Sequence, residues 1–360
     1  MGIQFDQDIM EILSRLPVQY PVQFKWVSKL WKAIIFDPYF KMNHLHHAKN
    51  DRDSQKTSFY ERSLKSGVSS MYCCPLSLVH RIVNVQKLDC PAISKITVYC
   101  SCNGLVIIHV IDSINECFII MLWNPSAGES VVLPDPEFPL VEGSCLGLGY
   151  DPTSGDYKIL KLCSDKDGSE VPGEILVLKS GSCRNIDKHP HGICNKVSGM
   201  GSALAFVNEA FHWIGMYGNH FEVSKTYSLV SFSISNEVYR EIPLLEQILS
   251  LKGSFYISVS VLDGMLCVHS NFPKHTFQFW VLKDYGVKES WNALLTIDDP
   301  CIFQAVPKYR FGDGEVLFWS CILSAVGRIH LGHPEDNLAH PEDDIDHVMP
   351  FRMDLLLQKV

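Results

Sequence analysis

Two closely spaced pairs of cysteines are candidate ligands for a metal ion. Cys73 and Cys74 are adjacent, Cys100 and Cys102 are separated by one residue, and the chain has 13 cysteines. A structural zinc site takes four ligands, usually in two spaced pairs, and no Cys-x-x-Cys or second paired cluster completes such a set. We therefore predict reduced, mostly buried thiols and no bound metal.

Histidines and carboxylates gather towards the C-terminus. The motif HPED occurs twice, at His333 and His340, with His330 and His347 nearby. Imidazole and carboxylate groups together bind zinc, so a metal site is one interpretation of this segment. The acidic sequence around them favours the other interpretation, a solvated acidic tail over residues 331–360 with incidental histidines. Its last apolar stretch, MPFRMDLLL, is suited to dock back as a strand or helix.

Nucleophile and cofactor motifs are also missing from the sequence. GSCLGLGYD (143–151) is no Gly-x-Ser-x-Gly elbow, and it falls in a strand hairpin instead of a strand-to-helix turn. Cys183 and His189 are too close within one hairpin to form a nucleophilic pair, and no phosphate loop or dinucleotide fingerprint occurs. We expect no catalytic residue, no cofactor and no enzyme. A copper radical oxidase is the enzymatic alternative, but its Tyr, His and cross-linked Cys ligands cannot be assembled here.

The composition and net charge limit the classes of partner that this protein could bind. The 360 residues are 46% hydrophobic and 20% charged, which indicates a folded protein, and the net charge is −9. A nucleic acid or an anionic membrane would need a basic face, so we expect neither as a partner. The longest apolar runs are too short to span a membrane, and no secretory signal begins the chain. We expect a cytoplasmic or nuclear location.

The helical pattern is concentrated near the N-terminus. Ile9, Ile12, Leu13 and Leu16 recur at helical spacing, and Pro17 ends that helix. Pro21 fits the first turn of a second helix, where its missing N–H costs nothing. Ser28 suits the N-cap of a third, which Asp37-Pro38 ends. Three helices this short cannot enclose all their apolar side chains, so these either pack on the rest of the chain or form a partner surface.

The remainder alternates like β-strands and repeats. Polar turns recur at Asn103-Gly104, Ser154-Gly155, Asn208-Glu209, Asp263-Gly264 and Asp313-Gly314, at steps of about fifty residues. A second hairpin follows each of the first four turns, as in MLWNPSAGESVVLP. Two hairpins per period are typical of four-stranded propeller blades, although strand pairs also suit a sandwich. We predict a propeller, with its blade-strand tryptophans buried: Trp123, Trp213, Trp280 and Trp319.

The N-terminal block resembles an F-box. The matching residues, in order and spacing, are Glu11-Ile12-Leu13, Leu16-Pro17-Val18, Phe24, Val27, Lys29, Trp31 and Asp37-Pro38-Tyr39-Phe40. The family's opening Leu-Pro is replaced by Phe5-Asp6, which predicts a looser start to the first helix. Pro21 replaces an aliphatic residue, which predicts a shortened second helix. The resemblance implies binding to a Skp-type adaptor, through Ile9, Ile12, Leu13, Leu16, Pro17, Val22, Phe24, Val27, Leu30, Trp31 and Ile34.

The β-rich part, from about Cys100 to Trp319, resembles the F-box associated domain of a large plant family that includes self-incompatibility pollen F-box proteins. The landmarks are SCNGLVII, LWNPSAGESVVLP, GLGYDPTSGDYKILKL, ALAFVNEAFHWI and VLDGMLCV. The resemblance implies a kelch or galactose-oxidase-like β-propeller that binds a protein to be ubiquitinated. Five and six blades both fit, because the strands before residue 99 are less legible.

Together these features predict a mainly β protein with a small N-terminal α module. The expected parts are a three-helix F-box (1–48), a linker with first strands (49–98), a β-propeller-like domain (99–330) and the acidic tail (331–360). The expected function is the substrate-recognition subunit of an SCF-type ubiquitin ligase, with cullin and RING subunits reached through the adaptor. Family resemblance adds S-RNase as a candidate substrate. The alternative is a non-SCF interaction propeller with a degenerate F-box.

Three loops are longer and more polar than a tight hairpin needs, as binding loops on a rigid scaffold often are. They span residues 164–173, 189–201 and 216–225. The adaptor surface of the F-box has to stay free for the ligase to assemble. We therefore expect the target protein to bind these loops, on the propeller face turned away from the helices.

Overall fold

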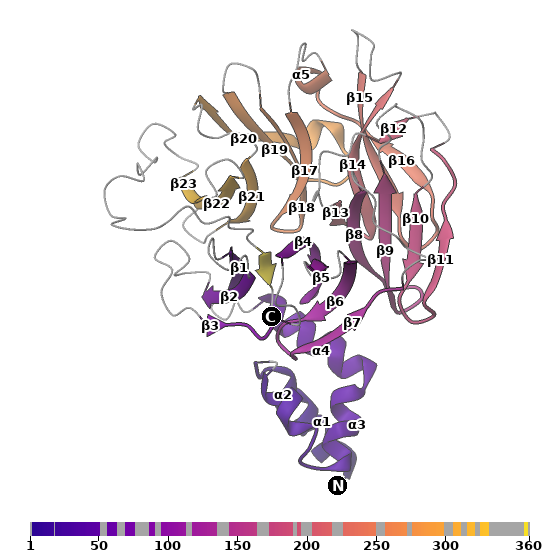
Figure 1. Cartoon of the computed structure of the whole chain (residues 1–360), viewed down its shortest axis with the longest axis vertical. Helices are drawn as coiled ribbons and strands as arrows, with labels where there is room; N and C mark the ends of the chain where they lie inside the picture. Colours follow the sequence, from indigo (N-terminus) through magenta and orange to yellow (C-terminus); the bar gives the residue numbers. More distant parts are fainter. Residues whose placement is uncertain are drawn as a thin grey trace.

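The structure is a computed structural model of the whole chain. It describes residues 2–17, 19–50, 56–62, 69–75, 86–90, 95–112, 117–134, 144–163, 173–189, 193–195, 204–217, 226–249, 256–271, 276–298, 305–310, 315–320, 325–330 and 356–358. Four N-terminal helices project from a ring of β-sheets (Figure 1). No helix in these ranges has the length and apolar character needed to cross a bilayer.

The three predicted helices are present as α1 (Gly2–Ser14), α2 (Gln19–Phe24) and α3 (Lys29–Phe36). Ser28 caps α3 as expected, because its Oγ accepts a hydrogen bond from the Trp31 N–H at 3.1 Å. Helix α1 runs through Phe5 and Asp6, so the predicted loosening of its start is absent. Helix α2 has only six residues and carries Pro21 in its first turn.

A fourth helix, α4 (Pro38–Asn50), was not predicted. Asp37-Pro38 ends α3 but also begins α4, because Asp37 Oδ1 accepts hydrogen bonds from the backbone N–H groups of Tyr39 at 2.8 Å and Phe40 at 3.3 Å. Pro38 then occupies the first helical position, which needs no N–H. The Asp-Pro pair is therefore a helix start as well as a helix stop, and the predicted three-helix module has four helices.

Strands of the described part form six antiparallel sheets, of which four have four strands, one has five and one has three. In chain order they are β1 (Lys56–Arg62), β2 (Ser69–Pro75), β3 (Gln86–Lys87), β4 (Lys95–Cys102), β5 (Leu105–Asp112), β6 (Cys117–Asn124), β7 (Glu129–Val132), β8 (Ser144–Asp151), β9 (Asp156–Cys163), β10 (Glu174–Val177), β11 (Ser182–Asn185), β12 (Cys194–Asn195), β13 (Ala205–Val207), β14 (Ala210–Tyr217), β15 (Thr226–Ser233), β16 (Tyr239–Ile242), β17 (Tyr256–Leu262), β18 (Met265–Asn271), β19 (Thr276–Leu282), β20 (Trp291–Asp298), β21 (Ala305–Arg310), β22 (Glu315–Ser320), β23 (Ala325–His330) and β24 (Leu356–Gln358). Helix α5 (Glu246–Leu249) and the 3-10 helix η2 (Lys288–Ser290) interrupt them.

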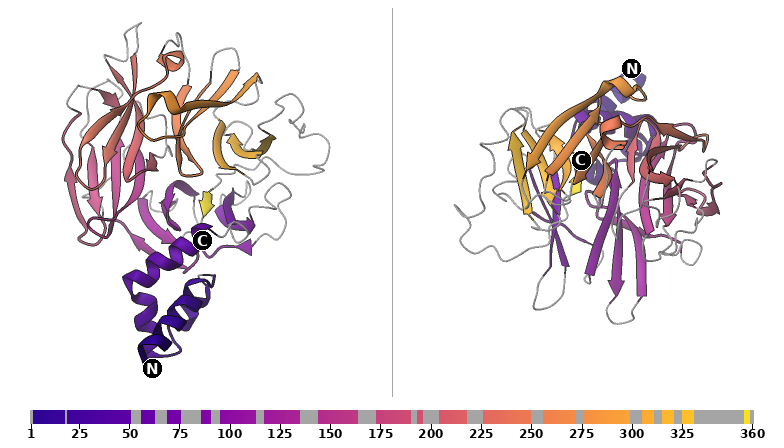
Figure 2. Two further views of the ribbon diagram at one scale, coloured as in Figure 1. Left: turned by 180° about the vertical axis from the view of Figure 1, so that it is seen from behind. Right: turned by 90° about the horizontal axis from the view of Figure 1, so that it is seen from above.

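The sheets are arranged like the blades of a propeller (Figure 2). The first strands of neighbouring sheets contact each other, with β4 against β8, β13 against β8, β17 against β13 and β14, and β21 against β17. Aliphatic side chains fill the space between the sheets; Ile107 of β5 and Leu146 of β8, for example, are fully buried in one cluster. The mainly β fold class and the propeller are thus confirmed. Segment 49–98, predicted as a linker with first strands, forms the end of α4 and strands β1–β3 of the first sheet, and β4 begins within it.

The recurring turns lie where the sequence places them. Asn103-Gly104, Asn208-Glu209 and Asp263-Gly264 join β4 to β5, β13 to β14 and β17 to β18, with both turn residues at positive φ. In the five-stranded sheet β12 and β13 both pair with the edge of β14 that β15 leaves, so together they hold the first position and β14 the second. Such turns match the twist of a hairpin, and Asn, Asp and Gly adopt them most readily. Residues 311–314, which include the fifth turn, lie outside the described residues.

Successive turns of an antiparallel meander alternate between the two ends of its strands. The first–second and third–fourth strand turns of each sheet therefore share one side of the ring, which we call the turn face. The second–third connections and the links to the next sheet share the opposite side, the loop face. Most residues of the three predicted binding loops (164–173, 189–201 and 216–225) lie outside the described residues. The strands before them end on the loop face, at Cys163, Asn185 and Tyr217. Two described parts of these ranges are strand and not loop, namely β12 (Cys194–Asn195) and the end of β14.

The C-terminal segment supplies a strand to the first sheet. Residues Leu356–Gln358 (β24) pair antiparallel with Lys56–Ser58 of β1 and contact β4. β24 thus takes the inner position that a first strand holds in the other sheets. These three residues of the segment predicted as a tail close the ring; the HPED repeats lie outside the described residues.

Tryptophans lie inside the propeller as predicted. Trp123 on β6, Trp213 on β14 and Trp280 on β19 are all buried. Trp319 lies on β22 opposite Val306, and its side chain is outside the described set. Where it is described, each of these tryptophans belongs to the core.

Candidate protein-interaction surface

The interior of the helical module is small. Leu13, Ile34 and Phe40 are buried at its centre, and half-buried apolar residues pack around them. The Phe24 ring meets the Trp31 ring edge-on, with 5.3 Å between centroids. The predicted apolar stripes therefore largely face this interior and not a partner.

Helix α4 is fastened to α1 by polar contacts. Asn43 Nδ2 donates a hydrogen bond to Ser14 Oγ at 3.3 Å, and His44 Nε2 lies 2.9 Å from the carbonyl oxygen of Leu16. Burial lowers the pKa of His44, the Leu16 carbonyl acting in the opposite direction. The unpredicted helix thus completes the module's core and holds the end of α1.

The residues predicted to bind an adaptor fall into three groups. Leu13 and Ile34 are buried, so they shape the surface from inside and do not form it. Half-buried members are Ile9, Leu16, Val22, Phe24 and Trp31. Exposed members are Ile12, Pro17, Val27 and Leu30.

Sequence reasoning missed five large side chains that are also exposed in this module. Together with Ile12, Val27 and Leu30 they form what we call the exposed apolar set, the added members being Tyr20, Trp26, Phe36, Tyr39 and Met42. Trp26 is 79% exposed and Tyr39 70%, values unusual for aromatic side chains of a closed fold. Helical spacing gives no signal for Trp26, which lies in the turn after α2. The other four lie on α2, α3 and α4, where residues off the buried stripe are expected to face outward.

Lysines flank the exposed aromatic rings. Lys25 Nζ lies 5.5 Å from the centroid of the Trp26 ring, and Lys32 and Lys41 lie 6.0 Å and 5.3 Å from that of Phe36. The first fifty residues hold six Lys or Arg and four Asp or Glu, whereas the whole chain holds 31 and 40. An apolar surface with a basic rim favours an acidic protein partner.

The helical module lies on the turn-face side of the ring. Lys25 Nζ is 3.5 Å from Glu129 Oε1, and Glu129 begins β7 directly after a third–fourth strand turn. Figure 1 shows the helices projecting from the part of the ring that holds β6 and β7. The loop face therefore points away from this attachment.

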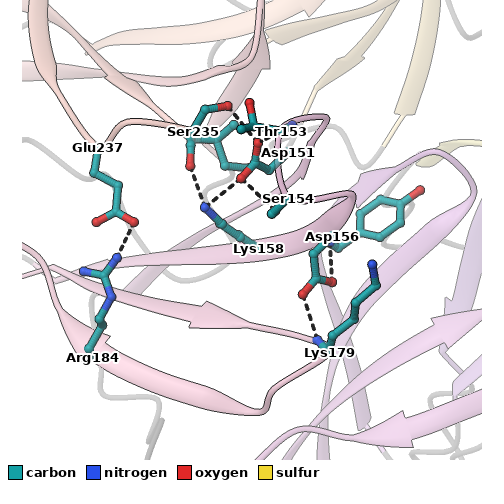
Figure 3. Close-up of polar contacts among 11 residues, drawn as sticks. Asp151, Thr153, Ser154, Asp156, Lys158, Lys179, Arg184, Ser235 and Glu237 are labelled. Atoms are coloured by element: carbon teal, nitrogen blue, oxygen red, sulfur yellow. Dashed lines mark hydrogen bonds and ion pairs between the residues drawn. The ribbon is translucent and has the colours of Figure 1, made fainter.

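The strongest candidate for chemistry in the propeller is a buried carboxylate with a buried lysine (Figure 3). Asp151 Oδ2 lies 2.8 Å from Lys158 Nζ, and Oδ1 accepts hydrogen bonds from Ser235 Oγ at 2.7 Å and the Thr153 N–H at 2.9 Å. Burial opposes ionisation of Asp151, but these partners outweigh it and hold the pKa of the carboxyl well below its usual range. A carboxylate that stays ionised with its lone pairs occupied is no proton donor, so this cluster is structural.

This polar cluster also joins two sheets. Ser235 and Glu237 come from the turn between β15 and β16, and they contact Asp151 and Arg184 of the neighbouring sheet. Lys158 Nζ in addition donates to the carbonyl oxygen of Ile234 at 2.8 Å. The turn of one blade is thereby held against the next.

The described part of the chain contains no metal-binding cluster, and two of the candidate cysteines are buried in it. No group of three His, Cys, Asp or Glu side chains with metal-binding arrangement occurs there. Cys73 and Cys100 are buried as predicted, and burial raises the pKa of the Cys100 thiol. Gly147 of GSCLGLGYD has a packing reason, since a Cβ there would lie 2.7 Å from the Phe211 ring.

Comparison with known proteins decides the family. The model of the F-box associated beta propeller domain matches residues 52–309, which is more than half of the chain. The chain belongs to the F-box associated β-propeller family. It is a plant F-box protein, and the matched range begins just before β1, so strands β1–β3 of the first sheet belong to the F-box associated domain.

Curated F-box proteins of Arabidopsis thaliana are similar to this chain over most of its length. It is 25% identical to the F-box/kelch-repeat protein At3g23880 of Arabidopsis thaliana, over 85% of this chain and 82% of the relative. It is 24% identical to the F-box protein CPR1 of the same plant, over 81% of this chain and 72% of the relative. Among solved structures, TolB from Acinetobacter baumannii is 12% identical with a TM-score of 0.44, covering 78% of this chain and 67% of TolB.

Proposed function

We propose that this protein is the substrate-recognition subunit of an SCF-type ubiquitin ligase. Its helical module binds a Skp-type adaptor, which connects it to cullin and RING subunits, and its propeller binds the protein to be ubiquitinated. The chain itself catalyses no step. It raises the concentration of target lysines near the charged conjugating enzyme. A cytoplasmic or nuclear location fits this role.

The observation that carries the proposal is the exposed apolar set on a module whose core is already complete. Leu13, Ile34 and Phe40 fill the interior, yet Ile12 is 62% exposed and Val27 62%. Leaving such side chains in water costs free energy that a partner can recover. Half-buried Trp31 and Phe24 support this surface from below.

Adaptor binding is tested by a double substitution, Ile12→Asp with Leu30→Asp. Both side chains are exposed, so the fold tolerates the change, while a buried interface would not accept the charges. Each loss of an apolar anchor weakens binding by about 2 kcal/mol or more. Isothermal titration calorimetry with a purified Skp-type adaptor measures the loss.

The matched control is Val287→Asp, a 46% exposed valine on the propeller. It should bind the adaptor like the unchanged protein. Unaltered affinity of the double variant would refute the adaptor role and leave the alternative, an interaction propeller that works outside the SCF complex.

For the target we propose the loop face. It lies opposite the side where Lys25 meets Glu129, so a bound adaptor leaves it open. The strands that end there are rigid core elements, which suits them to hold variable loops in fixed positions. S-RNase and a self-incompatibility role rest on the sequence resemblance alone, and the relatives' names mention neither.

A further inference from the structure

The outer strand of the second sheet, β7, has a free edge. Its four residues, Glu129–Val132, pair with β6 on one side, and no described strand pairs with the other. Val131 is 64% exposed and Val132 57%. Exposed β-branched residues on an open strand edge are a template for another strand.

The register shows which backbone groups point outward. The Leu133 N–H donates to the carbonyl oxygen of Ile120 at 2.9 Å, and these residues lie opposite each other when the β6–β7 register is extended by one pair. Hydrogen-bonded and non-bonded pairs alternate along antiparallel strands. Glu129 and Val131 therefore bond inward to β6, while Ser130 and Val132 direct their N–H and C=O groups away from the sheet. Pro134 has no N–H, so it ends this free edge.

Two other outer strands, β11 and β16, carry the protection that β7 lacks. On β11 the exposed side chains are Ser182, Arg184 and Asn185, and on β16 they are Arg240 and Glu241. Charges on an edge strand discourage pairing with another chain. The one charge on β7, Glu129, is at its end and is already paired with Lys25.

We propose that β7 pairs with β7 of a second copy of this protein. The free edge is self-complementary about a two-fold axis through Val131. In that register Ser130 lies opposite Val132 of the second copy, and each pair exchanges two backbone hydrogen bonds. Val131 of one copy then lies opposite Val131 of the second copy, in a pair without backbone hydrogen bonds, where side chains approach most closely.

Charge agrees with this register. Glu129 falls opposite Leu133 of the second copy, so like charges do not meet.

The helical module borders this strand edge with its most exposed aromatic side chain, Trp26. Lys25 Nζ lies 3.5 Å from Glu129 Oε1 and 5.5 Å from the centroid of the Trp26 ring. A second copy pairing at β7 arrives next to Trp26.

The contact is small, because four residues per copy bury far less than a standard interface. Self-association is therefore weak and depends on concentration. This inference does not depend on the adaptor proposal, since β7 belongs to the propeller.

Sedimentation velocity of the full chain, from micromolar to near-millimolar concentration, tests the pairing. The unchanged protein should shift from monomer towards dimer. Val131→Lys should weaken association about tenfold or more, since like charges would face each other across the axis. Val132→Pro should weaken it as well, because it removes an outward N–H that β6 does not use.

Asn185→Lys on β11 is the matched control, an exposed outer-strand residue that should leave association unchanged. Hydrogen exchange provides a second measurement: the amides of Ser130 and Val132 should exchange more slowly as concentration rises, and that of exposed Val287 should not. A monomer at every concentration overturns the proposal. So does a dimer that Val131→Lys and Val132→Pro leave intact, which would place the contact on another surface.

Discussion

Asp151 and Lys158 form a buried ion pair, with 2.8 Å between Oδ2 and Nζ, at the seam between two blades. Replacing Asp151 by Asn leaves the Lys158 ammonium buried without a counter-charge. We expect this variant to lose about 3–5 kcal/mol of unfolding free energy at neutral pH. Urea unfolding followed by circular dichroism measures it, with exposed Asp284→Asn as the control.

The same pair has a pH dependence of known sign. Because the folded-state pKa of Asp151 lies below the unfolded value of about 3.9, the stabilisation is present above that pH and is lost as pH falls towards the folded pKa. The gap between Asp151→Asn and the unchanged protein should therefore narrow in acid. A gap that stays constant down to low pH would contradict the assignment.

His212 is a buried base that stays uncharged in the folded protein at neutral pH. Burial lowers its pKa to about 4, its Nε2 lies 2.7 Å from Tyr285 Oη, and Nδ1 lies 3.3 Å from the Ala205 carbonyl oxygen. The unfolded chain binds a proton at a pKa of about 6.5, so stability is full above that pH and falls by about 1.4 kcal/mol per pH unit towards 4. His212→Gln should lack this part of the slope in thermal unfolding from pH 7 to 4. Parallel profiles for the two proteins would show that His212 does not titrate as described.

Adjacent residues of α1 should separate stability from binding. Leu13 is 2% exposed and Ile12 62%. Leu13→Ala should destabilise the helical module by about 2–5 kcal/mol through the cavity it leaves. Ile12→Ala should change stability by about 0.5 kcal/mol or less while weakening adaptor binding. Hydrogen exchange of α1 and α4 amides reports the first effect and calorimetry the second; equal effects of both variants on stability would contradict the burial pattern.

The terminal strand should stabilise the first sheet. Deleting residues 356–360 removes β24 from Lys56–Ser58 of β1, and we expect a loss of about 1–3 kcal/mol from the lost backbone hydrogen bonds. Deleting only residues 359–360 is the control. Identical melting temperatures for both truncations would show that the ring does not need this strand.

Target selection should follow the loop face. Exchanging loops 164–173, 189–201 and 216–225 with those of a relative of different specificity should transfer target binding, because the strands beneath them keep their core. Pulldown of each relative's target reads the result, and an exchange of the Asp263-Gly264 turn, which lies on the turn face, is the control. Specificity that stays with the scaffold would place recognition elsewhere.

The sequence by itself determined the local structure. Turn residues able to adopt positive φ, such as Asn103 and Gly104, recur at a fixed spacing and mark hairpins, and Ser28 marks a helix start through its own side chain. These signals act within a few residues, so they need no knowledge of distant contacts. The two modules, the propeller and the buried tryptophans could all be predicted in this way.

Only the tertiary structure decided which apolar residues face a partner. Leu13 and Ile12 are neighbours with similar side chains, yet Leu13 is buried and Ile12 is exposed. The difference arises because α4 packs over Leu13 and leaves Ile12 uncovered. Likewise, the pairing of Asp151 with Ser235 and of β24 with β1 joins residues far apart in the chain. Burial and ring closure depend on how elements pack over long sequence separations, and residue spacing carries no record of that packing.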